Sequence, residues 1–493
     1  MTRHGMAAAS VAVWAATALA TNVIYYVDQE HPRAADTNAG TSEAAPFKTI
    51  QAAVDKAGAD DMVLIKKGVY RETVVIRNGG VARGTPPFAD ALRWSSWLVL
   101  SAYGDDEVII DGSEPVPPQA WQPATGQTGV YVARVEIPPG PDMLRPPRGV
   151  TSVYWKGVRL TPCLRNRSGA WQREPPGASD TGTWHYDQGT TNLYVNLGGA
   201  DPRREQTGAV EAAVRAYGVT GGHYPGARQP DCVVVRKLTV RRTAWRAINL
   251  PRGSLAIVED CQVYDAEHGI AGGGTQFPIV RRCVVHDICS RALELGGSVG
   301  GRFYDNVVYA FGQDWFREHN VFMPWAFILF GAEFGRYFHN VVLQPYEHLN
   351  PVDRGGGFWP DCHSPSHWFV GNAVYQAGTG FYIESPVQGN IVRWNTACRG
   401  RDGIVLAINA VNHVAENYVA DNAVGCAQQG TESPWVRNNL FSRNWLKSNG
   451  TGLRMGPEPG THVQTRNYAQ GNVYEPRPGG RLARWAAADF TNL

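Results

Sequence analysis

The chain carries little charge of either sign and has no long apolar run beyond its first residues. Only 18% of its 493 residues are charged, and the formal net charge is +2. This balance gives no basis for nucleic-acid binding. No run of 18 or more apolar residues follows the N-terminal segment, so we expect no span through a membrane. The eight cysteines form no CxxC pair, and no His/Cys cluster indicates a zinc site.

Helical periodicity is scarce as well. One segment, residues 47–57 (FKTIQAAVDKA), places apolar residues on one face, and we expect this helix to cap the edge of a β domain. Elsewhere, short runs rich in Val, Ile, Phe and Tyr alternate with turns that use many of the 55 glycines. Such runs are typical of strands, so the sequence predicts an all-β protein.

A ladder of similar positions repeats through the second half of the chain. Its rungs are Leu238, Cys261, Cys283, Asn306, Asn340, Asn372, Asn395, Asn417 and Asn439. The steps between rungs are nearly equal, except for two longer ones, from Asn306 to Asn340 and from Asn340 to Asn372. Fixed periods of roughly 20 to 50 residues indicate a solenoid, here one built from strands. An inward Asn at each bend can bond backbone groups of its own coil and of the next, which would otherwise be buried without partners.

Two carboxylates stand at the same place in consecutive repeats. The stretches GFWPD and GFYIE end at Asp361 and Glu384, one period apart. Apolar residues alternate inward, so Trp359 and Tyr382 point outward beside the two acids. Neighbouring strands lie about 4.8 Å apart, and the carboxyl pair of a retaining glycosidase is about 5–5.5 Å apart. A solvated surface is the alternative, but stacked like charges are unfavourable unless a ligand, metal or shared proton compensates.

The two long steps predict loops that wall a cleft on this face. They fall near residues 312–324 and 344–354, just before the coil with Asp361. The candidate substrate-binding residues are Trp359, Tyr382, His363, Trp315, Glu318, Glu347, His348, Asp353 and Arg354. His363 and His367 follow Asp361 and are similar candidates for sugar binding; His363 could bond a sugar hydroxyl, orient a carboxylate or merely occupy a turn. These residue types are common in sugar sites, so the cluster favours an oligo- or polysaccharide substrate.

The first twenty residues are typical of a signal peptide, which predicts a secreted or periplasmic protein; a segment that stays on the chain is the alternative. Export would permit disulfides, and Cys261 and Cys283 fit either a bond or an interior stack of thiols. The expected organisation is a signal peptide (1–20), a cap with the first coils (21–112), an inserted β-rich subdomain (113–219), the main solenoid with the cleft (220–445) and a C-terminal tail or cap (446–493).

The opening of the chain resembles a known superfamily. Residues 47–53 (FKTIQAA) and 68–70 (GVY), together with the Asn ladder, are similar to those of right-handed parallel β-helix, or pectate-lyase-like, proteins. The insertion, which ends in GTWHYDQGTTNLYVNL (182–197), resembles one found in β-helix glycoside hydrolases such as the family 120 β-xylosidases. The resemblance implies a right-handed parallel β-helix with an inserted β subdomain and an N-terminal capping helix.

The same resemblance implies functions for the two carboxylates. In family 120 an Asp in a W-x-D context is the nucleophile, and a Glu one coil later is the acid/base. Asp361, which follows Trp359 and Pro360, and Glu384 match these places. The resemblance therefore implies a retaining, β-xylosidase-like hydrolase that needs no cofactor. Cys362 departs from the family, which tends to have Trp there, so the match in sugar specificity is weaker than the match in chemistry.

Two other functions fit the scaffold. A calcium-dependent polysaccharide lyase or uronate epimerase would use Asp361 and Glu384 as calcium ligands and an arginine as base, with Arg354, Arg399 and Arg401 as candidates. Against this reading, the next stacked position is Ala407, so there is no third acidic rung. A non-catalytic binding solenoid, finally, would predict no carboxylate pair beside aromatic residues.

Overall fold

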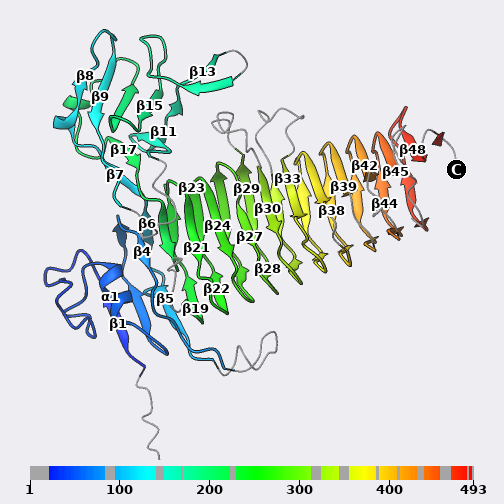
Figure 1. Cartoon of the computed structure of the whole chain (residues 1–493), viewed down its shortest axis with the longest axis horizontal. Helices are drawn as coiled ribbons and strands as arrows, with labels where there is room; N and C mark the ends of the chain where they lie inside the picture. The colour runs from blue at the N-terminus through cyan, green and yellow to red at the C-terminus, as the bar shows by residue number, and fades with distance from the viewer. Residues whose placement is uncertain are drawn as a thin grey trace, which may run out of the picture.

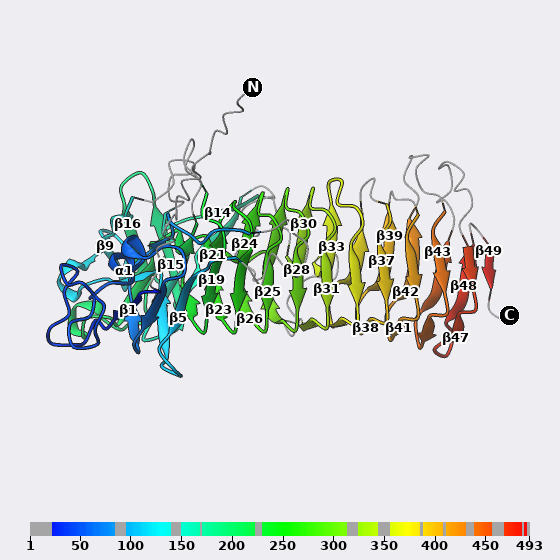
Figure 2. The same cartoon turned by 90° about the horizontal axis from the view of Figure 1, so that it is seen from below.

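Short strands recur once per period and stack into three long parallel sheets, which wind around one axis as a right-handed β-helix (Figure 1). The computed structural model describes residues 22–83, 95–139, 149–167, 170–221, 229–312, 324–343, 355–384, 388–407, 411–429, 438–455, 468–485 and 488–490. Figure 2 shows the strands side by side along the length of the molecule. The predicted all-β solenoid is confirmed.

The three sheets, named A, B and C, contain 13, 12 and 13 strands. Sheet A comprises β1 (Ile24–Val27), β2 (Met62–Ile65), β5 (Leu98–Ala102), β19 (Val233–Arg236), β22 (Ala256–Glu259), β25 (Ile279–Arg281), β28 (Arg302–Tyr304), β31 (Arg336–Phe338), β34 (Trp368–Val370), β37 (Ile391–Arg393), β40 (His413–Ala415), β43 (Leu440–Ser442) and β46 (Tyr468–Gln470). Sheet B comprises β3 (Gly68–Tyr70), β6 (Val108–Asp111), β20 (Thr239–Arg241), β23 (Gln262–Ala266), β26 (Val284–Ile288), β29 (Val307–Phe311), β32 (Val341–Leu343), β35 (Ala373–Tyr375), β38 (Thr396–Cys398), β41 (Tyr418–Ala420), β44 (Trp445–Lys447) and β47 (Val473–Glu475). Sheet C comprises β4 (Val74–Val75), β18 (Tyr217–Thr220), β21 (Arg246–Leu250), β24 (His268–Gly273), β27 (Leu293–Gly296), β30 (Trp325–Phe330), β33 (Gly356–Asp361), β36 (Thr379–Ile383), β39 (Asp402–Ala407), β42 (Val424–Gln429), β45 (Thr451–Met455), β48 (Arg481–Trp485) and β49 (Ala488–Phe490).

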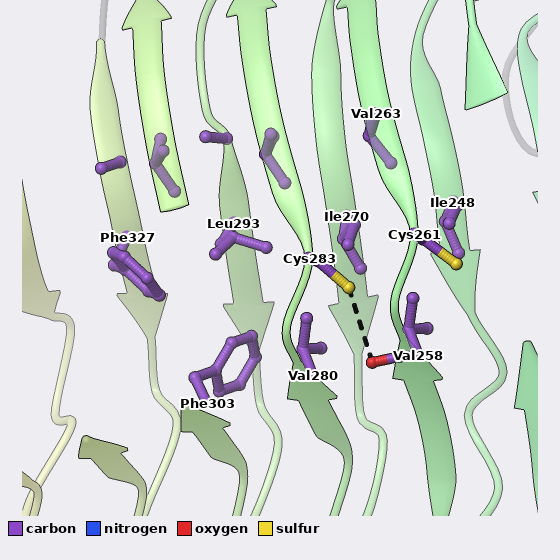
Figure 3. Close-up of a cluster of buried hydrophobic side chains, with 14 of the residues drawn as sticks. Ile248, Val258, Cys261, Val263, Ile270, Val280, Cys283, Leu293, Phe303 and Phe327 are labelled. Atoms are coloured by element: carbon purple, nitrogen blue, oxygen red, sulfur yellow. Dashed lines mark hydrogen bonds between the residues drawn. The ribbon is translucent and has the colours of Figure 1, made fainter. Parts of the chain in front are cut away.

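Inward residues of successive coils stack in columns along the axis. One column on sheet C, part of which Figure 3 shows, comprises Ile248, Ile270, Leu293, Phe327, Phe358, Phe381 and Ile404. Its three phenylalanine rings lie parallel, with centroids 4.4 and 4.9 Å apart. Burying each such side chain stabilises the fold by about 1.5–3 kcal/mol. The column fixes the register of the coils on which the carboxylates lie.

Cysteine thiols occupy another interior column. Cys261 and Cys283 are buried, and the thiol of Cys283 donates to the carbonyl of Val258 at 3.7 Å (Figure 3). All eight cysteines are free thiols. The neighbouring Cys283 thiol, together with burial, raises the pKa of Cys261 well above its ordinary value. Of the two alternatives that the sequence left open, the structure contains the thiol stack.

The Asn ladder forms continuous hydrogen-bonded chains. Asn372 illustrates the pattern: its Oδ1 accepts the backbone N–H of Asn340 at 3.0 Å, and its Nδ2 donates to the carbonyl of Tyr337 at 2.9 Å and to Asn395 Oδ1 at 3.0 Å. The chain of side chains joins Asn306, Asn340, Asn372, Asn395, Asn417, Asn444 and Asn472. This arrangement confirms that the side chains bond backbone groups across coils.

The last rung of the predicted ladder is wrong. Asn417 is followed by Asn444, whose Oδ1 accepts the N–H of Asn417 at 3.1 Å. Asn439 instead continues a second chain, in which it bonds Asn412 at 3.0 Å. A constant spacing between rungs predicted Asn439 as the rung after Asn417, but the step from Asn417 to Asn444 is 27 residues. A ladder of fixed period does not detect the extra residues of this coil.

The helix α1 (Ile50–Lys56) is shorter than the predicted segment 47–57. Thr49 is its N-cap, and the carboxylate of Glu72 accepts the N–H groups of Ile50 and Gln51 at 2.8 and 2.9 Å. Phe47 lies outside the helix because it bridges to β1. The apolar face of α1 packs on β1, β2 and β4 at the N-terminal end of the coils, as Figure 1 shows. The predicted capping helix is therefore present.

A separate β-rich unit is inserted between β6 and β18 and lies beside the N-terminal coils (Figure 1). Its strands are β7 (Ser113–Pro115), β8 (Gln122–Pro123), β9 (Val130–Arg134), β10 (Val153–Trp155), β11 (Val158–Arg159), β12 (Thr161–Pro162), β13 (Leu164–Arg167), β14 (Ala170–Arg173), β15 (Thr183–Asp187), β16 (Asn192–Asn196) and β17 (Val210–Ala213), with short 3-10 turns at η1 (Pro118–Ala120) and η2 (Pro202–Arg204). It has a hydrophobic core of its own.

Ion pairs attach the inserted unit to the coils. Asp111, at the end of β6 just before the insertion, is fully buried and accepts a hydrogen bond from Arg241 Nε at 2.7 Å, which joins β6 to β20 within the coils. Glu211 on β17 pairs with Arg242 at 2.5 Å, which ties the root of the insertion to the coil that follows β20. Further out, Arg159 on β11 lies 3.5 Å from Asp265 on the coil.

The coils extend further along the chain than the boundary expected at residue 445. The strands β45 to β48 continue all three sheets in parallel register. The final strand β49 turns back and pairs antiparallel with β48, which closes the C-terminal end of sheet C. Among the residues described, no helix has the length and apolar character that crossing a membrane requires.

Candidate active site

Asp361 and Glu384 lie at the same edge of sheet C on consecutive coils. Asp361 is the last residue of β33, and Glu384 directly follows β36. The register pairs Phe358 with Phe381, and the N–H of Glu384 donates to the carbonyl of Pro360 at 3.1 Å. The backbones that bear the two carboxylates are therefore one strand spacing apart, about 4.8 Å. Both acidic residues are partly buried and alternate with buried inward residues, so they face outward.

Aromatic side chains flank the carboxylates on the same face. The rings of Trp359 and Tyr382 are 6.2 Å apart at 68°, and Trp325 on β30 lies 5.1 Å from Trp359. The indole N–H groups of Trp325 and Trp359 are buried and have no hydrogen-bond partner among the described residues. Buried donors that lack a partner are costly.

Both carboxylates influence the thiol of Cys362. Asp361 Oδ1 accepts the N–H of Cys362 at 2.6 Å, and the hydroxyl of Tyr382 donates to Glu384 Oε1 at 3.4 Å. Burial and the negative charges of Asp361 and Glu384 raise the pKa of the Cys362 thiol. The thiol at the end of β33 therefore lies within the electrostatic influence of both acids.

A pocket of about 410 Å³ opens beside Glu384 on this face. Its lining residues are Trp325, Trp359, Thr379, Tyr382, Glu384, Arg401, Asp402, Ala423, Val424, Gln429 and Arg454. Volumes of about 300–1,000 Å³ are usual for small-molecule sites. Asp361 is not among these lining residues. The pocket extends from the aromatic residues toward the C-terminal coils.

Arg401 lines the pocket, and its guanidinium group already donates hydrogen bonds to two neighbouring residues. Its Nε donates to Asp402 Oδ2 at 2.8 Å, and its Nη2 donates to Thr379 Oγ1 at 3.1 Å. Arg399 is exposed in the turn before β39. In the described part of the chain, no group of three or more His, Cys, Asp or Glu side chains is arranged to hold a metal ion.

The structure separates the histidines predicted near Asp361. His363 is exposed, in a turn where both Cys362 and His363 have positive φ angles (52° and 62°). His367 is fully buried: its Nδ1 accepts the N–H of Gly335 at 3.0 Å, and its Nε2 donates to the carbonyl of Ala332 at 2.9 Å. Burial lowers its pKa to about 3. The suggestion that His367 binds sugar is therefore wrong, because both of its nitrogens are used within the fold.

The remaining predicted binding residues lie outside the described residues. They are Trp315, Glu318, Glu347, His348, Asp353 and Arg354. Sequence reasoning also missed seven of the pocket residues, among them Trp325, Asp402, Gln429 and Arg454. Trp325 lies two residues before the inward Phe327, where strict alternation predicts an inward side chain, so the period-two pattern did not mark it. The other three lie on coils beyond Glu384, where no acidic repeat drew attention.

The fold is similar to that of solved carbohydrate-related proteins. A structure of XylC with xylose matches at a TM-score of 0.63 and 17% identity, over 94% of this chain and 86% of that one. This chain is a right-handed parallel β-helix protein. A structure named as a glycoside hydrolase gives a TM-score of 0.48 at 12% identity (92% and 96% covered), and the A-module of the Azotobacter vinelandii mannuronan C-5 epimerase AlgE6 gives 0.38 at 14% (89% and 93%). No protein-family model and no curated protein matches the sequence of this β-helix.

Proposed function

We propose that this β-helix protein is a glycoside hydrolase that cleaves its substrate with retention of anomeric configuration. The observation that carries the proposal is the register of β33 and β36, which sets Asp361 and Glu384 one strand spacing apart on one outward face. That spacing, about 4.8 Å between strands, suits the separation of about 5–5.5 Å in retaining enzymes and is too short to hold a water molecule for inversion.

In this proposal Asp361 is the nucleophile and Glu384 the acid/base. Glu384 starts protonated, because a second negative charge so near Asp361 is disfavoured. It gives its proton to the glycosidic oxygen while Asp361 attacks the anomeric carbon, so the C–O bond to the leaving group breaks as the ester forms. Glu384 then takes a proton from water, whose oxygen attacks the same carbon and releases Asp361. Every group in this sequence belongs to the protein, the substrate or water.

The neighbouring residues support a saccharide substrate. Trp359 and Tyr382 offer aromatic surface to a sugar ring, and the hydroxyl of Tyr382 bonds Glu384 at 3.4 Å and so orients it. The fold likeness to the complex of XylC with xylose agrees with a sugar ligand. The signal-like segment 1–20 is consistent with action on extracellular or periplasmic glycans.

The test begins with aryl glycosides, including β-xylosides, and with uronic polysaccharides, each with and without EDTA. New reducing ends without ultraviolet absorbance from an unsaturated uronate support hydrolysis. Absorbance that EDTA abolishes would instead establish a calcium-dependent lyase and refute the proposal. The stereochemistry of the first product, followed by NMR, must show retention; an inverted product would contradict the nucleophilic function of Asp361.

Two variants then separate the functions of the carboxylates. Asp361→Gly should be inactive and should recover turnover with azide, which replaces the missing nucleophile. Glu384→Gln should lose roughly a hundred- to ten-thousand-fold in kcat on substrates with poor leaving groups, and less on activated aryl glycosides. Glu416→Gln is the matched control, because that carboxylate pairs with Arg393 and Arg443 away from the pocket. Its activity should equal that of the wild type.

A further inference from the structure

A second pair of like charges lies at the far end of the outward row that contains Tyr382. The row runs through Tyr382, Val405, Ala427, Arg454 and Arg484 on successive strands from β36 to β48. Arg454 alternates with the buried residues Leu453 and Met455, so its side chain points outward. It lines the same pocket as Glu384. The pocket therefore holds the proposed acid/base Glu384 and, on a later coil, the cationic group of Arg454.

Among the residues that the structure describes, Arg454 has no counter-ion. It is partly buried and makes no hydrogen bond or ion pair with any residue that the structure describes. The other arginine of the pocket, Arg401, is paired with Asp402 at 2.8 Å. Directly beside Arg454 in register lies a second arginine, Arg484. Like charges on adjacent strands repel, and an anion bound at Arg454 would offset this repulsion.

We propose that Arg454 forms a subsite for an anionic sugar, one that carries a carboxylate or a sulfate ester. The guanidinium group presents a planar fork of donors that matches such anions in two parallel hydrogen bonds. This inference rests on the proposed function for the saccharide nature of its ligand, and it makes the substrate an acidic oligosaccharide. Gln429, which is uncharged and lines the pocket between the two ends, is compatible with a neutral sugar unit there.

The geometry sets where on the substrate the anion lies. Tyr382 and Arg454 are three strands apart, or roughly 14 Å at the usual strand spacing. A single sugar ring does not span that distance. The anionic group is therefore on a different sugar unit from the one whose glycosidic oxygen Glu384 would protonate. Arg454 would select the substrate without taking part in the chemistry.

Binding to the Glu384→Gln protein tests the subsite without turnover. The probes are acidic oligosaccharides, namely oligogalacturonides and xylo-oligosaccharides with a glucuronic acid branch, each paired with its carboxyl-reduced form, and a sulfated oligosaccharide paired with its desulfated form. We expect calorimetry to show roughly tenfold or tighter binding of the acidic member, and the preference should shrink at high salt. Which pair shows the preference distinguishes a carboxylate from a sulfate ester.

Adding Arg454→Gln should abolish the preference, and Arg454→Lys should keep part of it, because the charge remains without the fork. Arg204→Gln is the control, since that side chain is 85% exposed on the inserted unit. Arg454→Gln should melt at the wild-type temperature or above it, because it relieves repulsion by Arg484. Equal binding within every pair, a preference that survives Arg454→Gln, or a clear fall in melting temperature would each overturn the subsite.

The two proposals fail in different ways. A protein that prefers the acidic member of a pair but hydrolyses none of the tested glycosides contradicts the hydrolase and leaves the subsite standing. A protein that hydrolyses neutral oligosaccharides and shows no preference for acidic ones contradicts the subsite and leaves the hydrolase standing. Binding and turnover are measured on separate proteins, so each result counts against one proposal.

Discussion

The central rung of the Asn ladder should be one of the most sensitive positions in the molecule. Asn372 is 1% exposed, and its side chain joins Asn340, Tyr337 and Asn395. In Asn372→Ala the backbone N–H of Asn340 loses its acceptor and stays buried, at a cost of about 1–3 kcal/mol, and the other three hydrogen bonds are lost at about 0.5–1.5 kcal/mol each. We expect a total of about 3–5 kcal/mol, because water entry and relaxation recover part of it.

The assay is native-state hydrogen exchange, read by mass spectrometry on the peptides that contain β31, β34 and β37. A solenoid of this length need not unfold in one step, so the local opening free energy is the defined quantity. The control is Asn472→Ala. Asn472 is the last rung described; it is only partly buried and makes three of these hydrogen bonds. A loss of less than about 1 kcal/mol at position 372, or an equal loss at both positions, would refute the reasoning.

Three further predictions concern single residues. Gly380→Ala should destabilise sheet C by about 2–3 kcal/mol, because a Cβ there would stand 2.5 Å from a carbonyl oxygen of the next coil, whereas Gly58→Ala, with no heavy atom within 4 Å of the added carbon, should melt as the wild type does. The free energy of unfolding should fall as pH drops from about 6.5 toward 3, because the pKa of His367 is lowered from 6.5 to about 3 and only the unfolded chain binds that proton. Urea titrations should show that this free energy depends less steeply on pH in His367→Gln than in the wild type. An unchanged slope would contradict the burial of a neutral imidazole. Of the eight thiols, the one exposed in the structure, Cys362, should be alkylated in the native protein, and Asp361→Asn should speed that reaction near neutral pH because the negative charge of Asp361, which raises the thiol pKa, is gone; an unchanged rate would separate Asp361 from Cys362.

Most of the fold could be predicted from the sequence because a solenoid repeats one local rule. Inward residues such as Phe358 and Phe381 recur at a fixed interval, so the period, the strand type and the outward face of the carboxylates all follow from counting. Counting residues no longer predicts which rungs stack where a coil changes length. The step from Asn417 to Asn444 is 27 residues, and the hydrogen bonds of the buried amide, rather than the spacing, choose the partner.

The same limit explains what the sequence missed at the candidate site. Asp361 and Glu384 repeat within one motif at the common spacing, so the pair is visible in the chain. The steps from Ala427 to Arg454 and from Arg454 to Arg484 are both longer than the step between the two acids, and no shared motif surrounds them. Only the hydrogen-bonded register shows that both arginines continue the outward row of Tyr382. The catalytic functions of the two acids stay predictions, which the carboxylate variants test.

The two faces of sheet C separate stability from recognition. Along the inward column Phe358, Phe381, Ile404 and Leu453 are all apolar and buried, and each packs on the coils above and below it. The outward positions beside them change from ring to small side chain to arginine over the same strands. Since a coil is held by its interior and by its asparagines, one outward side chain can change without moving the register of the others. Substrate preference in this scaffold can therefore vary one rung at a time, and outward substitutions such as Arg454→Gln should alter binding without lowering the melting temperature.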